Sequence, residues 1–180
     1  MLDVTFITGN QNKADYLAKY LGGPINHNKL DLDEIQSLDL REVVERKARD
    51  AYDLVKSPVV VDDVSVEFKA LGRLPGTLIR WFLDDIGPEA ICRLLDGKDR
   101  SATARCAICY FDGVTLKVFE GVSAGAIAHK PEGTNGYGWD VIFIPNEFQA
   151  TSASLDEDDY RKFYFKVKPV DKLKAFLNSK

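Results

Sequence analysis

The residues best suited to hold a phosphate lie at the start of the chain. An apolar run ends at Thr8-Gly9-Asn10, and a helix-like stretch follows with Lys13 in its first turn. Free backbone N–H groups and the positive end of a helix dipole favour an anion at such a turn. Thr8, Asn10 and Lys13 would add a hydroxyl, an amide and a positive charge. The pattern indicates either a phosphate-binding turn or an ordinary helix start capped by Thr8 or Asn10.

A second candidate is the carboxylate pair Asp62-Asp63, which follows the apolar run Val59-Val60-Val61. We expect a buried strand that ends at this pair. Adjacent carboxylates repel each other unless a cation or hydrogen-bond donors compensate them. The pair therefore predicts a divalent-metal site or an acid/base site. In the alternative, one carboxylate caps the next turn and the other is solvated.

A third candidate is the glycine-rich segment 131–140. Its glycines allow close backbone approach, while Tyr137 and Trp139 offer flat rings and Asp140 offers an acceptor. Such a set could hold a planar heterocycle. In the alternative, the segment is a tight turn whose aromatic rings pack on the core.

Helix and strand patterns alternate along the chain that carries these candidates. Helices are predicted at Asn12 to Leu21, Asp39 to about Val55, Thr77–Ile86, Gly87 to about Asp96, and Pro169–Leu177; strands are predicted at Ala102–Phe111, Val114–Glu120, Val122–Ala128 and Val141–Ile144. Asp39 and Glu42 form a capping-box-like pair. Phe163, Phe165 and Val167 alternate with polar residues at the period of a strand. Lys47 falls on or beside the apolar stripe of its helix, so it either snorkels from the core edge or points into a cleft.

Composition excludes several classes of function. The chain has 180 residues, 45% of them hydrophobic, and a net charge of −4, which argues against broad binding of nucleic acid. We expect no membrane span and no signal peptide, and hence a cytoplasmic protein. Three cysteines suit a reducing compartment. Cys106 and Cys109 should point to opposite faces of a strand and pack in the core, and the isolated His27 and His129 indicate neither a triad nor a metal site.

The motifs in their order resemble the inosine triphosphate pyrophosphatase family, which hydrolyses non-standard purine nucleoside triphosphates. The resemblance runs from about Val4 to Pro145. Its marks are Thr8-Gly9-Asn10-x-x-Lys13, Leu32-Asp33-Glu34-Ile35-Gln36, Lys47-Ala48, Val61-Asp62-Asp63-Val64-Ser65, Ala70-Leu71-Gly72-Arg73-Leu74-Pro75-Gly76, Ile79-Arg80-Trp81-Phe82 and Gly136-Tyr137-Gly138-Trp139-Asp140-Val141-Ile142-Phe143.

The resemblance implies a role for each candidate residue. Thr8, Asn10 and Lys13 would hold the triphosphate, with Lys47 and Arg80 near the same anion. Glu34 and Asp63 would carry Mg²⁺, and Asp63 would orient or deprotonate the attacking water while Lys13 stabilises charge. Tyr137 would stack on the base, with Trp139 and Asp140 beside it. The products would be a nucleoside monophosphate and pyrophosphate.

The resemblance also implies the fold. We expect a single α/β domain over residues 1–180, elongated and two-lobed, with a long twisted mixed β-sheet, helices on its flanks and the active site in the cleft between the lobes. The family is commonly dimeric, so a homodimer is expected.

One family motif is altered near the C-terminus. Family members usually carry Ser-His-Arg there, which helps to select a 6-keto purine, and this chain has Tyr164-Phe165-Lys166. Lys166 can still donate to a keto oxygen, but Phe165 cannot. The preferred substrates are therefore inosine, deoxyinosine and xanthosine triphosphate, or another nucleotide such as a modified pyrimidine. A nucleotide-binding module without catalysis is the remaining alternative.

Overall fold

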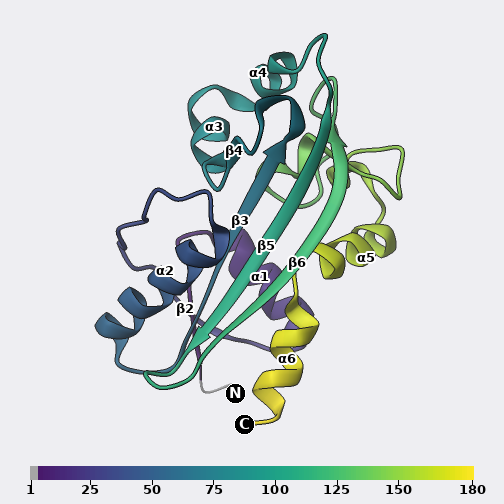
Figure 1. Ribbon diagram of the computed structural model, residues 1–180. Coiled ribbons are helices and arrows are strands. Elements are labelled where there is room, and N and C mark those ends of the chain that lie inside the picture. The colour runs from purple at the N-terminus through teal and green to yellow at the C-terminus, as the bar shows by residue number, and fades with distance from the viewer. Residues whose placement is uncertain (1–3) are drawn as a thin grey trace. The chain divides into compact units, whose positions relative to one another are not determined.

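The computed structural model describes residues 4–180 as a mixed α/β protein (Figure 1). Its elements are β1 (Thr5–Ile7), α1 (Gln11–Leu21), β2 (Asn26–Asn28), α2 (Leu40–Val55), β3 (Val59–Phe68), η1 (Lys69–Leu71), β4 (Pro75–Gly76), α3 (Ile79–Asp85), α4 (Gly87–Leu94), β5 (Ser101–Phe111), β6 (Leu116–Ile127), η2 (Gly138–Val141), β7 (Phe143–Pro145), η3 (Ser152–Ser154), α5 (Glu157–Val167) and α6 (Val170–Asn178). Among the helices of this range, none has the length and apolarity that a membrane crossing requires.

One seven-stranded mixed sheet links these elements in the order β2-β1-β3-β5-β6-β7, with β4 paired to β3. β1 runs parallel to both β2 and β3, whereas β4 is antiparallel to β3 and β7 is antiparallel to β6. The expected class, an α/β fold with a mixed sheet, is confirmed. The described chain divides into two compact units, and β3, β5 and β6 contribute residues to both.

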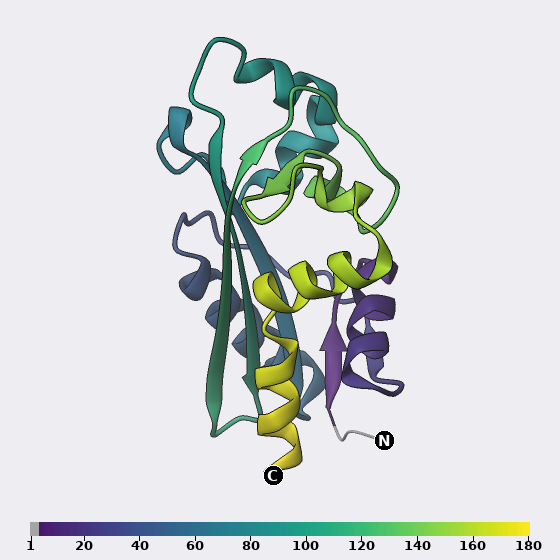
Figure 2. The ribbon, with the colours of Figure 1, turned by 90° about the vertical axis from the view of Figure 1, so that its right-hand side faces the viewer.

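Unit 1 comprises the described residues up to Asp63, together with Cys106–Glu120 and Lys168–Lys180. Its core forms where the apolar stripe of α2 packs on the strands, and it contains Val44, Ala48, Val59, Val61 and Cys109. Figure 2 shows α1 on the opposite side of these strands from α2, next to α6. Burial of this stripe explains why α2 forms, because helical stability in proteins comes mainly from tertiary packing.

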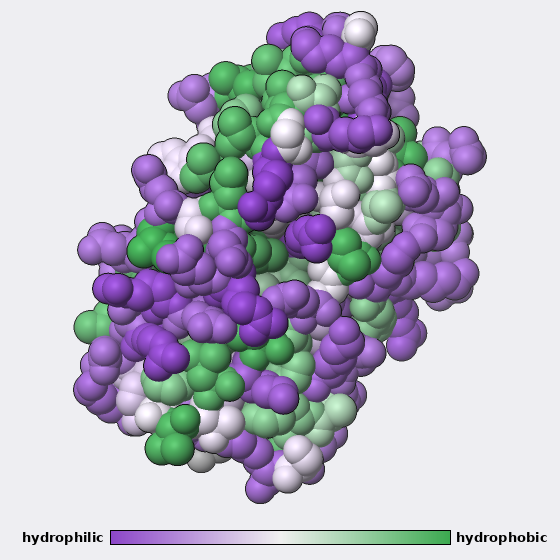
Figure 3. Space-filling model, viewed as in Figure 1, coloured by the Kyte–Doolittle hydropathy of each residue, from purple (hydrophilic) through white to green (hydrophobic). Residues whose placement is uncertain are grey.

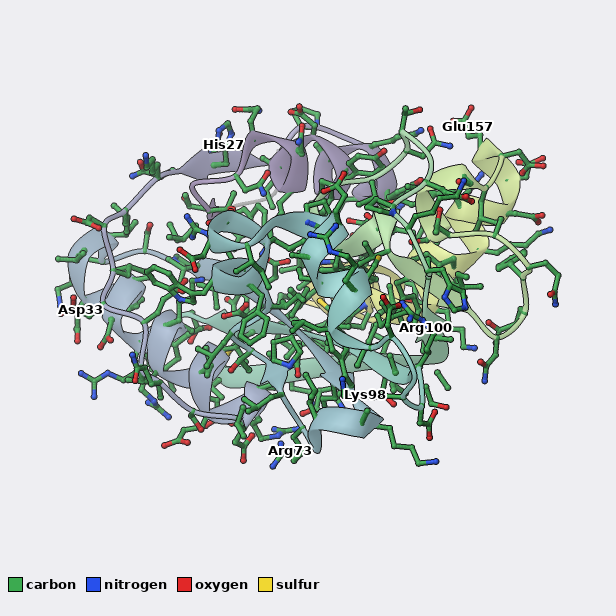
Figure 4. All side chains as sticks on the ribbon, turned by 90° about the horizontal axis from the view of Figure 1, so that it is seen from above. His27, Asp33, Arg73, Lys98, Arg100 and Glu157 are labelled. Atoms are coloured by element: carbon green, nitrogen blue, oxygen red, sulfur yellow. The ribbon has the colours of Figure 1, made fainter. Side chains whose placement is uncertain are left out.

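Unit 2 comprises Val64–Arg105 and Gly121–Val167. Arg100, labelled in Figure 4, connects α4 to β6. Its guanidinium donates to the carbonyl oxygen of Cys92 in α4 at 2.8 Å and to that of Ile127 in β6 at 2.7 Å. Apolar side chains reach its surface over α3 and α4 (Figure 3), where Trp81 of α3 and Leu94 of α4 are exposed.

Several predicted elements are confirmed. The helix predicted from Asp39 is α2, and Asp39 caps it by accepting from the Arg41 and Glu42 amides. The predicted capping box is only half formed, because the Glu42 carboxylate accepts from the Ser37 hydroxyl at 2.6 Å instead of the Asp39 amide. Cys106 and Cys109 are buried, as expected, and burial raises the pKa of their thiols to about 11 and about 12.

Three strand predictions were wrong. β3 does not end at Asp62-Asp63 but continues to Phe68, because Val66 and Phe68 supply further buried side chains. The separate strands predicted at Val114–Glu120 and Val122–Ala128 form one strand, β6, that passes through Gly121 without a turn. The last strand begins only at Phe143, because Val141 lies in η2.

A fourth error concerns the C-terminal region. The alternation of Phe163, Phe165 and Val167 indicated a strand, but these residues lie in the helix α5. Helical spacing accounts for the burial of this segment better, since Tyr160, Phe163, Tyr164 and Val167 are the residues it buries.

Candidate active site

The turn between β1 and α1 is built as the sequence predicted. Asn10 is the N-cap of α1, and its side-chain Oδ1 accepts from the Lys13 backbone amide at 3.3 Å. The backbone amide of Asn10 donates to the Thr8 hydroxyl at 3.1 Å. This confirms the capping role of Asn10. It also fixes Lys13 in the first turn of α1, from which its ammonium group reaches toward β3.

The central contact of unit 1 is a buried carboxylate held by two lysines. The Nζ atom of Lys13 lies 3.0 Å from Oδ1 of Asp62, and Nζ of Lys168 lies 3.2 Å from Oδ2. Burial alone would raise the pKa of Asp62, but Lys13 and Lys168 outweigh it and hold that pKa well below its usual range. Asp62 is therefore ionised in the folded protein, and its position within β3 makes it a fixed point for both lysines.

Lys168 was not among the residues predicted for the site. It lies between α5 and α6, and its side chain is only 6% exposed. A signal was present in the sequence, because Lys168 stands between Val167, Pro169 and Val170, all of which are buried. Lysines are almost never fully buried unless they are paired, so a lysine buried with these neighbours requires a carboxylate partner, which here is distant in the sequence.

A second ion pair lies in the same unit. Nζ of Lys47 is 2.6 Å from Oε1 of Glu34, and the Lys47 side chain is 15% exposed. Burial opposes the charge of Lys47, but Asp63 and Glu34 outweigh it and raise the lysine's pKa. Lys47 therefore points toward Glu34 and does not snorkel freely into solvent, while the cleft-facing orientation stays a prediction.

The carboxylates that act on Lys47 are of a type that could contribute to a magnesium site. No group of three or more His, Cys, Asp or Glu side chains suited to a metal occurs within residues 4–180. Mg²⁺ commonly binds through one or two carboxylates, with water and substrate phosphates supplying the remaining ligands. Glu34 and Asp63, which both act electrostatically on Lys47, supply that number of carboxylates.

In unit 2, the structure gives Asp140 three hydrogen-bond donors. Its Oδ2 accepts from the Tyr137 amide at 2.8 Å and from the Tyr160 hydroxyl at 3.2 Å, and Oδ1 accepts from the Ser152 hydroxyl at 2.8 Å. Gly136 has a φ of +72°, and a Cβ there would lie 2.6 Å from the Tyr160 hydroxyl. The glycine is required because the loop passes directly over this carboxylate.

The other predicted residues of unit 2 have varied surroundings. Trp139 is buried, with its ring edge-on to Phe143 and Phe163 at centroid distances of 5.5 and 6.1 Å. The packing alternative proposed for this loop therefore describes Trp139, whereas Tyr137 is half-buried. Lys166 pairs with Glu147, and the exposed Arg80 lies 3.3 Å from Asp84 on its own helix.

Unit 1 thus brings together the predicted residues Lys13, Lys47, Glu34 and Asp63, with Thr8 and Asn10 forming the turn that carries Lys13. Unit 2 brings together Tyr137 and Asp140 and places Trp139 in the core next to them. The cleft expected between two lobes stays a prediction.

A mixed α/β fold with lysines and carboxylates gathered beside a helix N-terminus defines a class of protein equipped to bind anions. The chain belongs to the Ham1 family, whose model matches residues 4–176. It is 40% identical to inosine triphosphate pyrophosphatase 2 of Trypanosoma cruzi over 96% of this chain and 90% of the relative. It is 36% identical to the inosine triphosphate pyrophosphatase of Yarrowia lipolytica over 99% of this chain and 97% of that protein.

Solved structures agree with these sequence comparisons. A HAM1 protein from Coxiella burnetii superimposes with a TM-score of 0.84 at 25% identity, covering 100% of both chains. The Staphylococcus aureus Ham1 protein gives a TM-score of 0.79 at 25% identity over 98% of both chains. The family resemblance inferred from the motifs is confirmed.

Proposed function

We propose that this protein is a Mg²⁺-dependent pyrophosphatase that hydrolyses inosine, deoxyinosine and xanthosine triphosphate to the monophosphate and pyrophosphate. Membership of the Ham1 family and relatives named inosine triphosphate pyrophosphatase along nearly the whole chain support the reaction. The observation that carries the proposal in this chain is the set of lysines and carboxylates in unit 1, which matches a highly charged anion and a metal.

Each residue of unit 1 has a task in this proposal. Lys13 and the backbone N–H groups at the start of α1 bind the triphosphate, assisted by Thr8, Asn10 and Lys47. Glu34 and Asp63 would hold Mg²⁺, which when bound would neutralise phosphate charge. Asp63 also accepts a proton from the water that attacks at the α–β linkage, and pyrophosphate leaves.

Unit 2 supplies the proposed base-binding residues. Tyr137 stacks on the purine, because its ring is half-buried and the Asp140 carboxylate fixes its backbone. Trp139 supports that loop from the core, and Lys166 donates to a keto oxygen of the purine. Arg80, by the family resemblance, adds positive charge for the triphosphate. Because Tyr164-Phe165-Lys166 stands in place of Ser-His-Arg, Lys166 is the remaining donor for a keto oxygen of the purine, and a different nucleotide preference is the alternative.

The decisive experiment is pyrophosphate release with Mg²⁺ from a panel of inosine, deoxyinosine, xanthosine, standard and modified pyrimidine triphosphates. Highest kcat/KM for the keto-purine nucleotides is the expected result. Highest activity with a modified pyrimidine would replace the proposed substrate while keeping the reaction. Binding without release from any member would contradict the proposed catalysis. Omitting Mg²⁺ should abolish release, which tests the metal separately.

We further propose a homodimer in the cytoplasm, on the family resemblance. Light scattering of the purified protein tests the dimer, and a mass corresponding to 20.1 kDa would contradict it.

A further inference from the structure

Lys168 has a position that the proposed reaction does not explain. Its ammonium group lies 3.2 Å from Oδ2 of Asp62, and its side chain is among the least exposed of the charged groups in unit 1. Lys13 holds the other oxygen of the same carboxylate at 3.0 Å. Two lysines therefore share one carboxylate, although a single lysine would neutralise it.

The two lysines differ in access to solvent. The side chain of Lys13 is 17% exposed, and Lys13 lies in the first turn of α1, which follows the exposed residues Gly9 and Asn10. Lys168 is held from the segment between α5 and α6, whose backbone is fixed by a 2.8 Å bond from the Val170 amide to the Lys168 carbonyl. Lys13 is thus the more exposed of the two partners and the one better placed to reach an incoming anion, whereas the ammonium group of Lys168 is buried beside Asp62.

Charge balance then determines what happens when Lys13 moves. A buried carboxylate without a counter-charge costs several kcal/mol. If Lys13 were the only partner of Asp62, every step of Lys13 toward a phosphate would incur that cost. With Lys168 in place, Asp62 keeps one cation while Lys13 is released.

We propose that Lys168 is a positioning residue that keeps Asp62 paired while Lys13 transfers from Asp62 to the phosphate chain of the ligand. This inference rests on the proposed function only in taking a triphosphate as the ligand. Lys168 touches neither substrate nor metal in this scheme, and its effect on binding passes entirely through Asp62.

The test is a double-mutant cycle on the binding of inorganic triphosphate, measured by titration calorimetry in buffer with Mg²⁺. Lys168→Met should raise Kd by about 100-fold, the equivalent of about 2.7 kcal/mol. Lys168→Arg should stay within about fivefold of the wild type. In an Asp62→Asn background, Lys168→Met should change Kd by less than about threefold, because no buried carboxylate then needs a partner.

One control variant and two contrary results separate this mechanism from direct attraction of the anion by Lys168 and from a purely structural role. Lys172→Met removes the same charge from an exposed lysine of α6, whose Nζ donates to the Glu120 carbonyl at 3.0 Å, and should leave Kd unchanged. An equal loss of affinity from Lys168→Met in both backgrounds would mean that Lys168 attracts the anion directly, and would overturn the proposal. So would a lower melting temperature with an unchanged Kd, which is the signature of a purely structural lysine.

If Lys168→Met does not fold, Lys168→Gln replaces it in the same cycle, because its amide can still donate to Asp62. The readout is independent of turnover. A protein that binds triphosphate with this pattern and releases no pyrophosphate would contradict the proposed function and support the role of Lys168. A wild-type protein that does not bind triphosphate would overturn the role of Lys168.

Discussion

Asp62 in unit 1 and Asp140 in unit 2 are both buried, but their oxygens meet different donors. Asp62 is held by the ammonium groups of Lys13 and Lys168, on long flexible side chains. Asp140 is held by a backbone amide and the hydroxyls of Ser152 and Tyr160. Ammonium groups can be redirected to another anion, whereas the donors around Asp140 are fixed by the loop they stabilise. The comparison indicates a carboxylate for binding chemistry in unit 1 and one for loop structure in unit 2.

The largest expected effect is a loss of turnover when Asp63, the neighbour of Asp62 in unit 1, is replaced. Asp63→Asn should lower kcat by about 10³-fold, because an amide cannot accept the proton of the attacking water. Nucleotide binding should stay measurable, and the melting temperature should change little, since Asp63 is only half-buried. Steady-state kinetics with inosine triphosphate and a parallel thermal denaturation measure both. Retained turnover would show that Asp63 is not the catalytic carboxylate.

Disrupting Asp140 should affect stability instead. Asp140→Ala leaves the Tyr137 amide and the hydroxyls of Ser152 and Tyr160 without their acceptor, so we expect a loss of about 3 kcal/mol in the free energy of unfolding. Urea denaturation measures it. Triphosphate binding by unit 1 should persist in the folded variant. Lost binding with unchanged stability would place Asp140 in the same functional class as Asp62.

Acid should weaken unit 1 through Asp62. Because folding lowers the pKa of this carboxyl, its stabilising effect is present above its ordinary pKa of 3.8 and is lost as the pH falls toward the folded value. Asp62→Asn should therefore be less stable than the wild type by about 2 kcal/mol at pH 7, and the difference should begin to narrow only below pH ~4 and shrink further as the pH approaches the folded pKa of Asp62. Urea denaturation from about pH 2 to 7 tests this. A constant difference across that range would contradict the assigned ionisation.

The smallest effect concerns the exposed partner of Lys47. Glu34 has a side chain that is 43% exposed, so Glu34→Gln should cost no more than about 1 kcal/mol of stability. Asp50→Asn is the matched control, because it removes a half-buried carboxylate partner, at 2.8 Å, of the exposed Arg46. Equal stabilities with a loss of Mg²⁺-dependent activity only in Glu34→Gln would support a metal role. A fall in activity for both variants would remove that support.

The sequence predicted local features well where one segment carries its own signal. Asp39 and the apolar stripe of α2 specified a helix, and Asn10 specified the start of α1. The sequence prediction failed at β3, where the charged pair Asp62-Asp63 was taken as the end of the strand. It also failed at α5, where alternation of apolar and polar residues was taken as the period of a strand. Both errors have the same cause. β3 continues past Asp63, and α5 forms a helix, because of side chains that become buried only in the folded protein.

By itself, the sequence determined the family and the mixed α/β class, and it supplied the residues of the candidate site, since these follow from local motifs and their order. Only the tertiary structure decided which charges meet. Lys168 and Asp62 are 106 positions apart, and no local pattern specifies the partner of a buried ion. Their pairing arises because folding removes both charges from water, where each must find compensation within reach.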